Sequence, residues 1–275
     1  MDKRRIDEWL KWGAQTLKTR VDRPMLEAQL LLCHAAGIER TELILRPERL
    51  IEAPAYEALV RRRAAHEPFE YLTGKAGFYS REFLTAPGVL IPRPETELLI
   101  DQAIAALEGV ANPRVAEIGT GSGVIAVMIA LLRPDARIIA TDINPKALAL
   151  AARNAERFGV SASIDFVETS LLEGVNQRLD LLVSNPPYIA ANYPLSPEVL
   201  KEPAEALFGG ERGDELLLQI IDLADERGIR ALACESGYDQ RESLRARLET
   251  KSWTKIDFYN DYAGLQRGFV ARRDD

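Results

Sequence analysis

Residues from Val115 onward alternate between short apolar runs and helical patterns, and no other feature of the chain constrains its fold as strongly. This alternation is typical of βαβ units, in which parallel strands form a sheet and helices cover both faces. The predicted helices lie near residues 123–132, 145–158 and 213–227, and the predicted strands are Val115–Ile118, Ala136–Thr141, Ser163–Val167, Leu179–Ser184 and Ile229–Glu235.

The C-terminal end of the chain adds two more predicted strands, Trp253–Tyr259 and Arg267–Ala271, on either side of a turn-rich stretch at Asn260–Gly264. A hairpin here would insert one antiparallel strand into an otherwise parallel sheet. A dehydrogenase sheet would instead continue with another parallel strand. We therefore expect a Rossmann-like α/β fold with a seven-stranded sheet and an antiparallel last strand.

The N-terminal part has a different character. Apolar residues recur at helical spacing from residue 5 to about residue 66, and no nucleotide or metal motif falls there. Aromatic and β-branched residues then alternate with polar ones, which predicts a β-hairpin or two short strands. The expected organisation is a small all-helical domain over residues 1–75, a β-hairpin linker over 76–92 and the α/β domain over 93–275.

Two local features refine this division. The loop Arg93–Glu97 begins a helix that runs through Leu107, and Thr96 or the preceding turn is expected to cap it. The basic run Arg61–Arg63 is expected to be a solvated helix face rather than a binding patch.

Composition excludes several classes of protein. The chain has 275 residues, of which 47% are apolar, enough for a sizeable core. No apolar run approaches the roughly 18 residues of a membrane span, and the N-terminus lacks the apolar segment of a signal peptide, so a cytoplasmic protein without membrane contact is expected. The two cysteines, Cys33 and Cys234, form no metal-ligand motif, so no metal is expected.

The charge distribution argues against direct binding of nucleic acid. The net charge is −7, whereas proteins that neutralise many phosphates are basic. Residues 1–75 contain 14 Lys and Arg against 12 Asp and Glu, and the remainder contains 21 against 30. A mildly basic N-terminal part and an acidic body suggest that the two parts have separate functions.

A glycine-rich turn follows the first predicted strand of the α/β domain, in the sequence Glu117-Ile-Gly-Thr-Gly-Ser-Gly123. Gly119 and Gly121 permit a tight turn and close approach of a ligand, and Gly123 permits the following helix to pack against the strand. Asp142 ends the second strand about 20 residues later, where a carboxylate can accept from both hydroxyls of an unphosphorylated ribose. Two alternatives stay open: Asp142 serves only as a cap of the helix at Pro145, a role that Asn144 also suits, and Glu117 is either a solvated strand end or an indirect contact to an ammonium group.

The tetrapeptide Asn185-Pro186-Pro187-Tyr188 directly follows the apolar run Leu179–Ser184. Two adjacent prolines cannot continue a hydrogen-bonded strand, and they fix the local backbone. The Asn185 side-chain oxygen and the Pro186 carbonyl can therefore be held in place to accept from one planar NH2 group, which Tyr188 would flank by stacking. Together with the glycine turn, this arrangement suggests methyl transfer from S-adenosylmethionine to a planar nitrogen.

Several stretches along the chain resemble the peptide chain release factor N5-glutamine methyltransferases, the PrmC/HemK family. The resemblance rests on GKAGFYSREF, VLIPRPETE, EIGTGSG, SNPPYI, ALFGG and DYAGLQR, and it extends over nearly the full length. It implies a class I S-adenosylmethionine-dependent methyltransferase fold behind a helical N-terminal domain that contacts the release factor. The acceptor it implies is the glutamine of the release factor GGQ motif.

The resemblance assigns roles residue by residue. Asn185, Pro186 and Tyr188 are the catalytic candidates, and with Pro187 they form the acceptor site. Binding of S-adenosylmethionine, with S-adenosylhomocysteine as product, is expected from Gly119, Thr120, Gly121, Ser122, Gly123, Asp142, Ser170 and Asn185. At the end of the third strand the chain departs from the family pattern, because Thr169, Ser170 and Leu171 stand where an acidic residue is common. The adenine contact there is not fixed by the sequence.

Three functions remain as hypotheses. The first is glutamine methylation of a release factor by a monomeric enzyme that does not contact nucleic acid. The second is adenine N6-methylation of DNA or RNA, which needs a flipped base and a basic binding surface. The third is a non-catalytic nucleotide-binding module, which would leave Asn185–Tyr188 unexplained.

Overall fold

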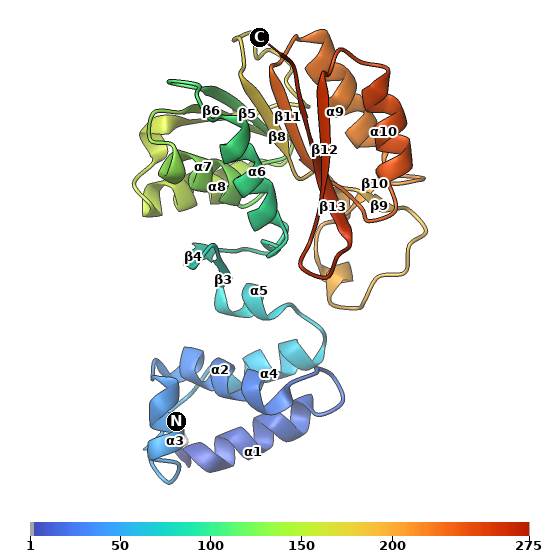
Figure 1. The fold of residues 1–275 in the computed structure, drawn as a ribbon. Helices are drawn as coiled ribbons and strands as arrows, with labels where there is room; N and C mark the ends of the chain where they lie inside the picture. Colours follow the sequence, from blue (N-terminus) through green and yellow to red (C-terminus); the bar gives the residue numbers. More distant parts are fainter. Residues whose placement is uncertain (1–2, 275) are drawn as a thin grey trace. The chain divides into compact units, whose positions relative to one another are not determined.

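The computed structural model describes residues 3–274, which divide into two compact units (Figure 1). The first unit contains the residues up to Lys75 together with Leu195–Lys201. The second unit contains Ala76–Pro194 and the chain from Glu202 onward. Nothing in the sequence predicts that residues 195–201 belong to the first unit.

The first unit is built from five helices among the described residues, and aromatic side chains pack at its centre. Trp9 and Tyr56 meet edge to face with ring centroids 5.5 Å apart. The helices are α1 (Ile6–Leu17), α2 (Pro24–Ala36), α3 (Arg40–Leu45), α4 (Tyr56–Ala64) and α5 (Phe69–Thr73), and two short antiparallel strands, β1 (Arg4–Arg5) and β2 (Leu50–Ile51), join them. The unit is therefore not entirely helical.

The basic run on α4 is only partly solvated. The Arg61 side chain is 70% exposed, as expected for a surface cation. Arg63 is only 5% exposed, and its Nη2 donates to Glu27 Oε1 at 3.2 Å and to Glu198 Oε2 at 3.0 Å. The expectation of a solvated face is thus wrong for Arg63, because a buried guanidinium needs charged partners.

The chain enters the second unit through a β-hairpin. Strands β3 (Lys75–Phe78) and β4 (Arg81–Leu84) form a two-stranded sheet. Tyr79 and Ser80 between them have φ values of 51° and 56°. Two successive left-handed residues match the right-handed twist of hairpin strands. Helix α6 (Thr96–Ala106) follows, and no side chain caps its N-terminus.

A seven-stranded sheet forms the centre of the second unit, and it confirms the predicted topology. The strand order is β12-β13-β11-β8-β5-β6-β7. The strands are β5 (Arg114–Ile118), β6 (Arg137–Asp142), β7 (Ile164–Glu168), β8 (Leu181–Ser184), β11 (Ala231–Glu235), β12 (Lys255–Asn260) and β13 (Gln266–Arg272). Only β13 runs antiparallel to its neighbours β11 and β12, and the other sheet pairs are parallel.

Helices cover both faces of this sheet (Figure 1). Helix α6, α7 (Val124–Leu132) and α8 (Pro145–Arg157) pack on one face, around Leu99, Met128 and Ile138. Helices α9 (Glu215–Glu226) and α10 (Arg241–Glu249) pack on the other, around Ile220, Leu244 and Phe269. Helix α10 was not predicted from the sequence, because only Leu244 and Leu248 of its nine residues are buried and so narrow an apolar stripe gives a weak periodic pattern.

The remaining strands and helical turns are short. Strands β9 (Ile189–Ala190) and β10 (Phe208–Gly210) form a short parallel pair. Three single turns of 3₁₀ helix lie at Ser161–Ser163, Val199–Lys201 and Ala204–Ala206, the second of them within the first unit.

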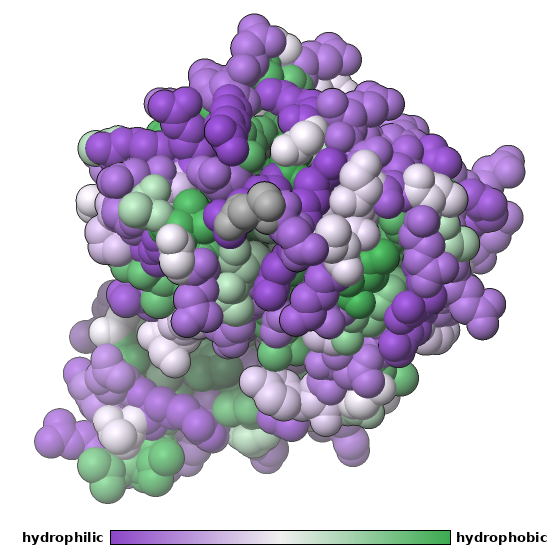
Figure 2. Space-filling view, turned by 45° about the horizontal axis from the view of Figure 1, so that its top comes forward, coloured by the Kyte–Doolittle hydropathy of each residue, from purple (hydrophilic) through white to green (hydrophobic). Residues whose placement is uncertain are grey.

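One face of the molecule is mostly polar. Hydrophilic residues dominate the face drawn in Figure 2, and apolar residues are interspersed among them. Among residues 3–274 no helix has both the length and the apolar character that crossing a bilayer requires.

Gly123 is expected to be the costliest glycine of the turn to replace. Its φ is 81°, and a Cβ there would lie 2.8 Å from Ala151 Cβ, so the close partner is α8 rather than the strand expected from the sequence. A left-handed alanine costs about 1–2 kcal/mol, and overpacking adds about 1–3 kcal/mol. Gly123→Ala should therefore lower the free energy of unfolding by about 2–5 kcal/mol in urea denaturation.

Gly174→Ala is the matched control for this measurement. Gly174 has a φ of 74°, but no atom lies within 4 Å of an added Cβ. It should show the backbone cost of about 1–2 kcal/mol alone. Equal losses for the two variants would contradict the contact with Ala151.

Candidate active site

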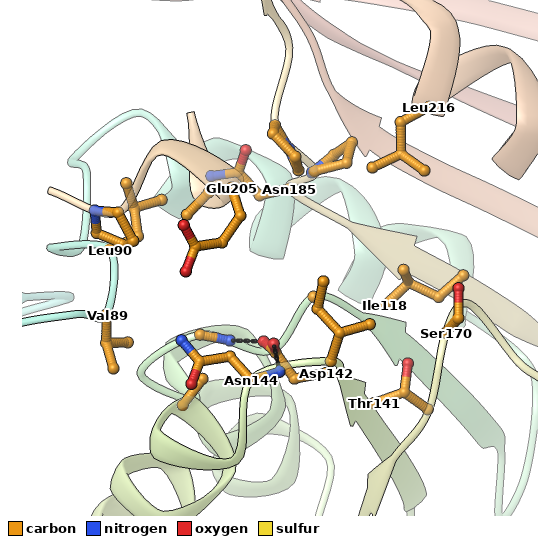
Figure 3. Close-up of a pocket in the computed structure, with 18 of the residues that line it drawn as sticks. Val89, Leu90, Ile118, Thr141, Asp142, Asn144, Ser170, Asn185, Glu205 and Leu216 are labelled. Carbon is orange, nitrogen blue, oxygen red and sulfur yellow. Dashed lines mark hydrogen bonds between the residues drawn. The ribbon is translucent and has the colours of Figure 1, made fainter. Parts of the chain in front are cut away.

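One cavity of the second unit opens at the carboxyl ends of the sheet strands, where α/β folds place their ligands. Asp142 lies on one side of it and Asn185 on the other (Figure 3). Its lining also contains Gly119, Gly121, Pro186 and Pro187. These residues follow β5, β6 and β8, which are adjacent in the sheet. The fold thus brings the two predicted half-sites to one cavity.

The glycine turn offers an open backbone to this cavity. Gly119 and Gly121 have φ values of 73° and 55°, and no atom lies within 4 Å of a Cβ added at either position. The N–H groups of Gly119 and Thr120 donate to the Thr141 carbonyl at 2.8 and 3.0 Å, which ties the turn to β6. A ligand can therefore approach Gly119 and Gly121 closely without displacing side chains.

Asp142 lies at the cavity wall between the turn and the next helix. Its Oδ2 accepts from the Gly121 N–H at 2.9 Å and its Oδ1 from the Asn144 N–H at 2.9 Å. Each oxygen keeps a further acceptor position, and burial raises the pKa of the carboxyl. The cap of α8 is Asn144, which accepts from the Lys146 N–H at 3.0 Å, so the capping alternative for Asp142 is wrong.

Three residues of the turn are absent from the lining of the cavity. The Thr120 hydroxyl donates to Glu117 Oε2 at 2.8 Å, and the Ser122 carbonyl accepts from Asn154 Nδ2 at 2.8 Å. Gly123 packs on α8. Thr120, Ser122 and Gly123 therefore shape the turn from behind and are not among the residues that line the cavity.

Glu117 is buried rather than solvated. It is 1% exposed, its Oε2 accepts from Thr120 and Ala126, and its Oε1 has no hydrogen-bond partner among residues 3–274. Burial raises the pKa of Glu117 to about 8, with the nearby Asp142 charge adding to the effect. The reading of Glu117 as a solvated strand end is therefore wrong.

Glu117→Gln is expected to weaken the pH dependence of stability. The pKa of Glu117 lies at about 8 in the folded protein, against about 4.3 in an unfolded chain. The folded state therefore holds this proton more tightly, and the free energy of unfolding falls as pH rises between these values, by at most about 1.4 kcal/mol per pH unit. Urea denaturation across that range should show a shallower slope for the variant, and Glu173→Gln at an exposed position should keep the wild-type slope.

The acceptor half of the site is held by contacts on its far side. Asn185 Nδ2 donates to Thr96 Oγ1 at 3.0 Å. A Cβ added to Gly209 would lie 2.4 Å from the Pro187 carbonyl oxygen, and one added to Gly213 would lie 2.4 Å from that of Tyr188. The glycines of the ALFGG segment and the following loop thus let β10 and its turn lie directly behind the Asn185–Tyr188 backbone.

Tyr188 is not among the residues that line the cavity. Its ring packs beside the core formed with α9 and α10, and its hydroxyl donates to Glu235 Oε1 at 3.0 Å. Its carbonyl accepts from Gln240 Nε2 at 2.8 Å. Burial, the Glu235 charge and the hydrogen bond to Glu235 raise the pKa of the Tyr188 phenol.

The end of the third strand contributes to the cavity as expected. Thr169, Ser170 and Leu171 all line it. Ser170 lies on the side of the cavity opposite to Val89 and Leu90 (Figure 3). The Thr169 hydroxyl donates to the Glu173 carbonyl at 3.1 Å. Contact between Ser170 and an adenine ring stays a prediction.

The roles of two buried carboxylates were not predicted from the sequence. Glu235 is fully buried and accepts from Thr96 and Tyr188. Glu202 is 6% exposed and accepts from the Ile91 N–H at 3.0 Å and from Arg93. The one available signal was that Glu235 ends a predicted central strand, at the same edge as Asn185. Among the described residues no group of three or more His, Cys, Asp or Glu side chains could hold a metal ion.

Known families match both parts of the chain. Residues 8–74 match the PrmC N-terminal domain, and residues 93–237 match the methyltransferase small domain. The release factor glutamine methyltransferase of Burkholderia pseudomallei is 40% identical over 90% of this chain and 91% of that protein. The release factor glutamine methyltransferase of Nitratidesulfovibrio vulgaris is 40% identical over 92% of this chain and 90% of that protein.

Solved structures share the fold of a large part of the chain. The ribosomal protein L11 methylase of Lactobacillus delbrueckii subsp. bulgaricus has a TM-score of 0.51 and 26% identity, covering 69% of this chain and 84% of its own. The human methyltransferase 10 domain containing protein has a TM-score of 0.54 and 18% identity, covering 72% and 90%. The latter likeness concerns the fold alone.

The sheet topology, the glycine turn and the matched domain define a class I methyltransferase. The relatives that match nearly the full length of the chain narrow this class to one family. The chain belongs to the release factor glutamine methyltransferase family.

Proposed function

We propose that this protein transfers a methyl group from S-adenosylmethionine to the side-chain amide nitrogen, N5, of the glutamine in the GGQ motif of peptide chain release factors. The relatives' names support the substrate class. The observation that carries the proposal is that Asn185 and Pro186 line the same cavity as Gly119, Gly121 and Asp142. The proposed binding site for a planar nitrogen and the proposed binding site for a nucleoside thus lie in the same cavity.

The donor half fits S-adenosylmethionine. The two oxygens of Asp142 each keep an acceptor position for a ribose hydroxyl, and the open backbone at Gly119 and Gly121 leaves room for the amino acid part. Val89, Leu90 and Leu171 supply apolar walls for a ring. When bound, S-adenosylmethionine supplies an electrophilic methyl group on a sulfonium.

The acceptor half suits a poor nucleophile. An amide nitrogen has a delocalised lone pair, so the site must orient it and stabilise the charge that develops on it. The Asn185 Oδ1 and the Pro186 carbonyl would each accept from the acceptor NH2 group. The nitrogen–carbon bond forms as the carbon–sulfur bond breaks, and one amide proton then leaves to solvent. No histidine or metal is needed for this step.

The domain roles extend the proposal. Residues 1–75 would form the module that contacts the release factor, residues 76–92 the linker, and residues 93–275 the catalytic domain. The match of residues 8–74 to the PrmC N-terminal domain supports a role in partner recognition. We propose that the enzyme is a monomer and that it binds the release factor without nucleic acid.

Transfer of tritium from labelled S-adenosylmethionine tests the function. Label on the glutamine of the GGQ motif of a release factor, located by mass spectrometry of its peptides, supports the proposal. Label on a DNA or RNA oligonucleotide instead would indicate adenine methylation. Absence of label on every acceptor would indicate a non-catalytic binding module. A release factor whose GGQ glutamine is replaced by alanine is the matched control and should take up no label.

A further inference from the structure

We propose that Thr96 and Glu235 are positioning residues that fix which end of the Asn185 carboxamide faces the acceptor. This inference rests on the proposed function. Neither residue lines the cavity, and both are almost completely buried, with Thr96 2% exposed and Glu235 0% exposed. Their only route to the reaction is therefore through the residues that they hold.

Three hydrogen bonds connect these residues in one chain of atoms. Asn185 Nδ2 and Thr96 Oγ1 are 3.0 Å apart, and Thr96 Oγ1 and Glu235 Oε2 are 2.7 Å apart. On the other side, the Tyr188 hydroxyl and Glu235 Oε1 are 3.0 Å apart. Glu235 thus joins the two ends of the Asn185–Tyr188 segment through its two oxygens.

The direction of donation follows from the chemistry of the carboxylate. An ionised carboxylate only accepts, so the Thr96 hydroxyl must donate its single proton to Glu235. The Thr96 oxygen is then left to accept, which selects the NH2 end of the Asn185 carboxamide. Asn185 Oδ1 has no partner among residues 3–274 and remains available to the acceptor amide. A flipped carboxamide would place Asn185 Oδ1 against the Thr96 oxygen and Asn185 Nδ2 against the acceptor NH2 group. Both hydrogen bonds would then be lost.

The surroundings of Glu235 determine its charge. The charged and titratable groups that face it are Tyr188 after β8, Glu95 from the loop before α6, Arg267 from β13 and Tyr259 from β12. Burial raises the pKa of Glu235 to about 7, against the opposing effect of the hydrogen bonds from Thr96 and Tyr188. Arg267 also lowers it and Glu95 raises it.

Protonation of Glu235 would release the constraint on Asn185. A neutral carboxyl can donate to Thr96, whose own proton is then free to donate to Asn185 Oδ1. Both orientations of the carboxamide then become possible, and only one binds the acceptor. Activity should therefore fall as pH decreases through about 7, because the folded-state pKa of Glu235 lies there. The acceptor amide itself does not titrate in this range.

Thr96→Val tests the positioning role, because valine keeps the shape of threonine and removes its hydroxyl. We expect kcat with a release factor to fall roughly 10- to 100-fold, while the dissociation constant for S-adenosylmethionine stays unchanged in calorimetry. Thr96→Ser should restore most of the activity. Ser243→Ala is the matched control: it removes a hydroxyl that donates to the Asp214 carboxylate, and neither residue lines the cavity. It should keep wild-type kcat.

The pH profile is a second readout that a merely structural role would not move. Wild-type kcat should show an acid limb near pH 7, as set by the pKa of Glu235. Glu235→Gln should remove this limb, whereas Glu117→Gln, at the other buried carboxyl of raised pKa, should retain it. Thr96→Val with wild-type kcat, or Glu235→Gln with an unchanged limb, would overturn the proposal. If the variants do not fold, a wild-type profile that is flat down to about pH 5 would overturn it equally.

Failure of this inference is distinguishable from failure of the proposed function. A wild-type enzyme that labels no release factor refutes the function itself. If the wild-type enzyme labels the release factor, but Thr96→Val keeps its kcat or Glu235→Gln keeps its pH profile, only the roles of Thr96 and Glu235 are refuted.

Discussion

Asn185→Ala is expected to lower kcat by about 10²- to 10³-fold, the usual cost of removing one preorganised polar group from a site of developing charge. Asn185 Oδ1 would accept from the acceptor amide, so its removal leaves the nitrogen without orientation. Binding of the donor should change little, because Asp142 and the glycine turn make the main donor contacts in the proposed site. Steady-state kinetics with a release factor, together with calorimetry of S-adenosylmethionine, measure the two effects separately.

Asn176→Ala is the matched control for this prediction, since Asn176 is an exposed loop residue outside the cavity. It should leave both kcat and donor affinity unchanged. A fall in donor affinity for Asn185→Ala as large as the fall in kcat would contradict the role of Asn185 at the acceptor.

Asp142→Ala is expected to weaken donor binding by about 1–3 kcal/mol, the value of charge-assisted hydrogen bonds. Asp142 also accepts from the Gly121 and Asn144 N–H groups, so part of the loss would come from a less ordered turn. Calorimetry gives the dissociation constant, and thermal denaturation shows whether the fold is retained. Asp165→Ala on an exposed position of β7 is the control. An unchanged dissociation constant for Asp142→Ala would exclude Asp142 from the donor site.

The seven-stranded sheet and the cavity were predictable because their signals are local. Each strand and helix carries its own hydropathy pattern, and the carboxyl ends of parallel strands meet at one edge. That geometry is why Gly119, Asp142 and Asn185 lie around one cavity although they are distant in the sequence.

Side-chain contacts between distant segments were not predictable in this way. Thr96 and Glu235 are 139 residues apart, and nothing in either local pattern indicates that they meet. Arg63 looked like one of three equivalent surface cations, but its position on α4 faces Glu27 of α2 and Glu198. Tyr188 was expected to flank the acceptor by stacking, and nothing in its local sequence indicates that its hydroxyl donates to Glu235.

The most direct test of the account is a crystal structure of the enzyme with S-adenosylhomocysteine and a peptide that contains the GGQ motif. We predict that the side-chain nitrogen of the peptide glutamine lies about 2.7–3.2 Å from both Asn185 Oδ1 and the Pro186 carbonyl oxygen, the distance range of hydrogen bonds. A glutamine nitrogen beyond hydrogen-bond reach of both oxygens would contradict the account.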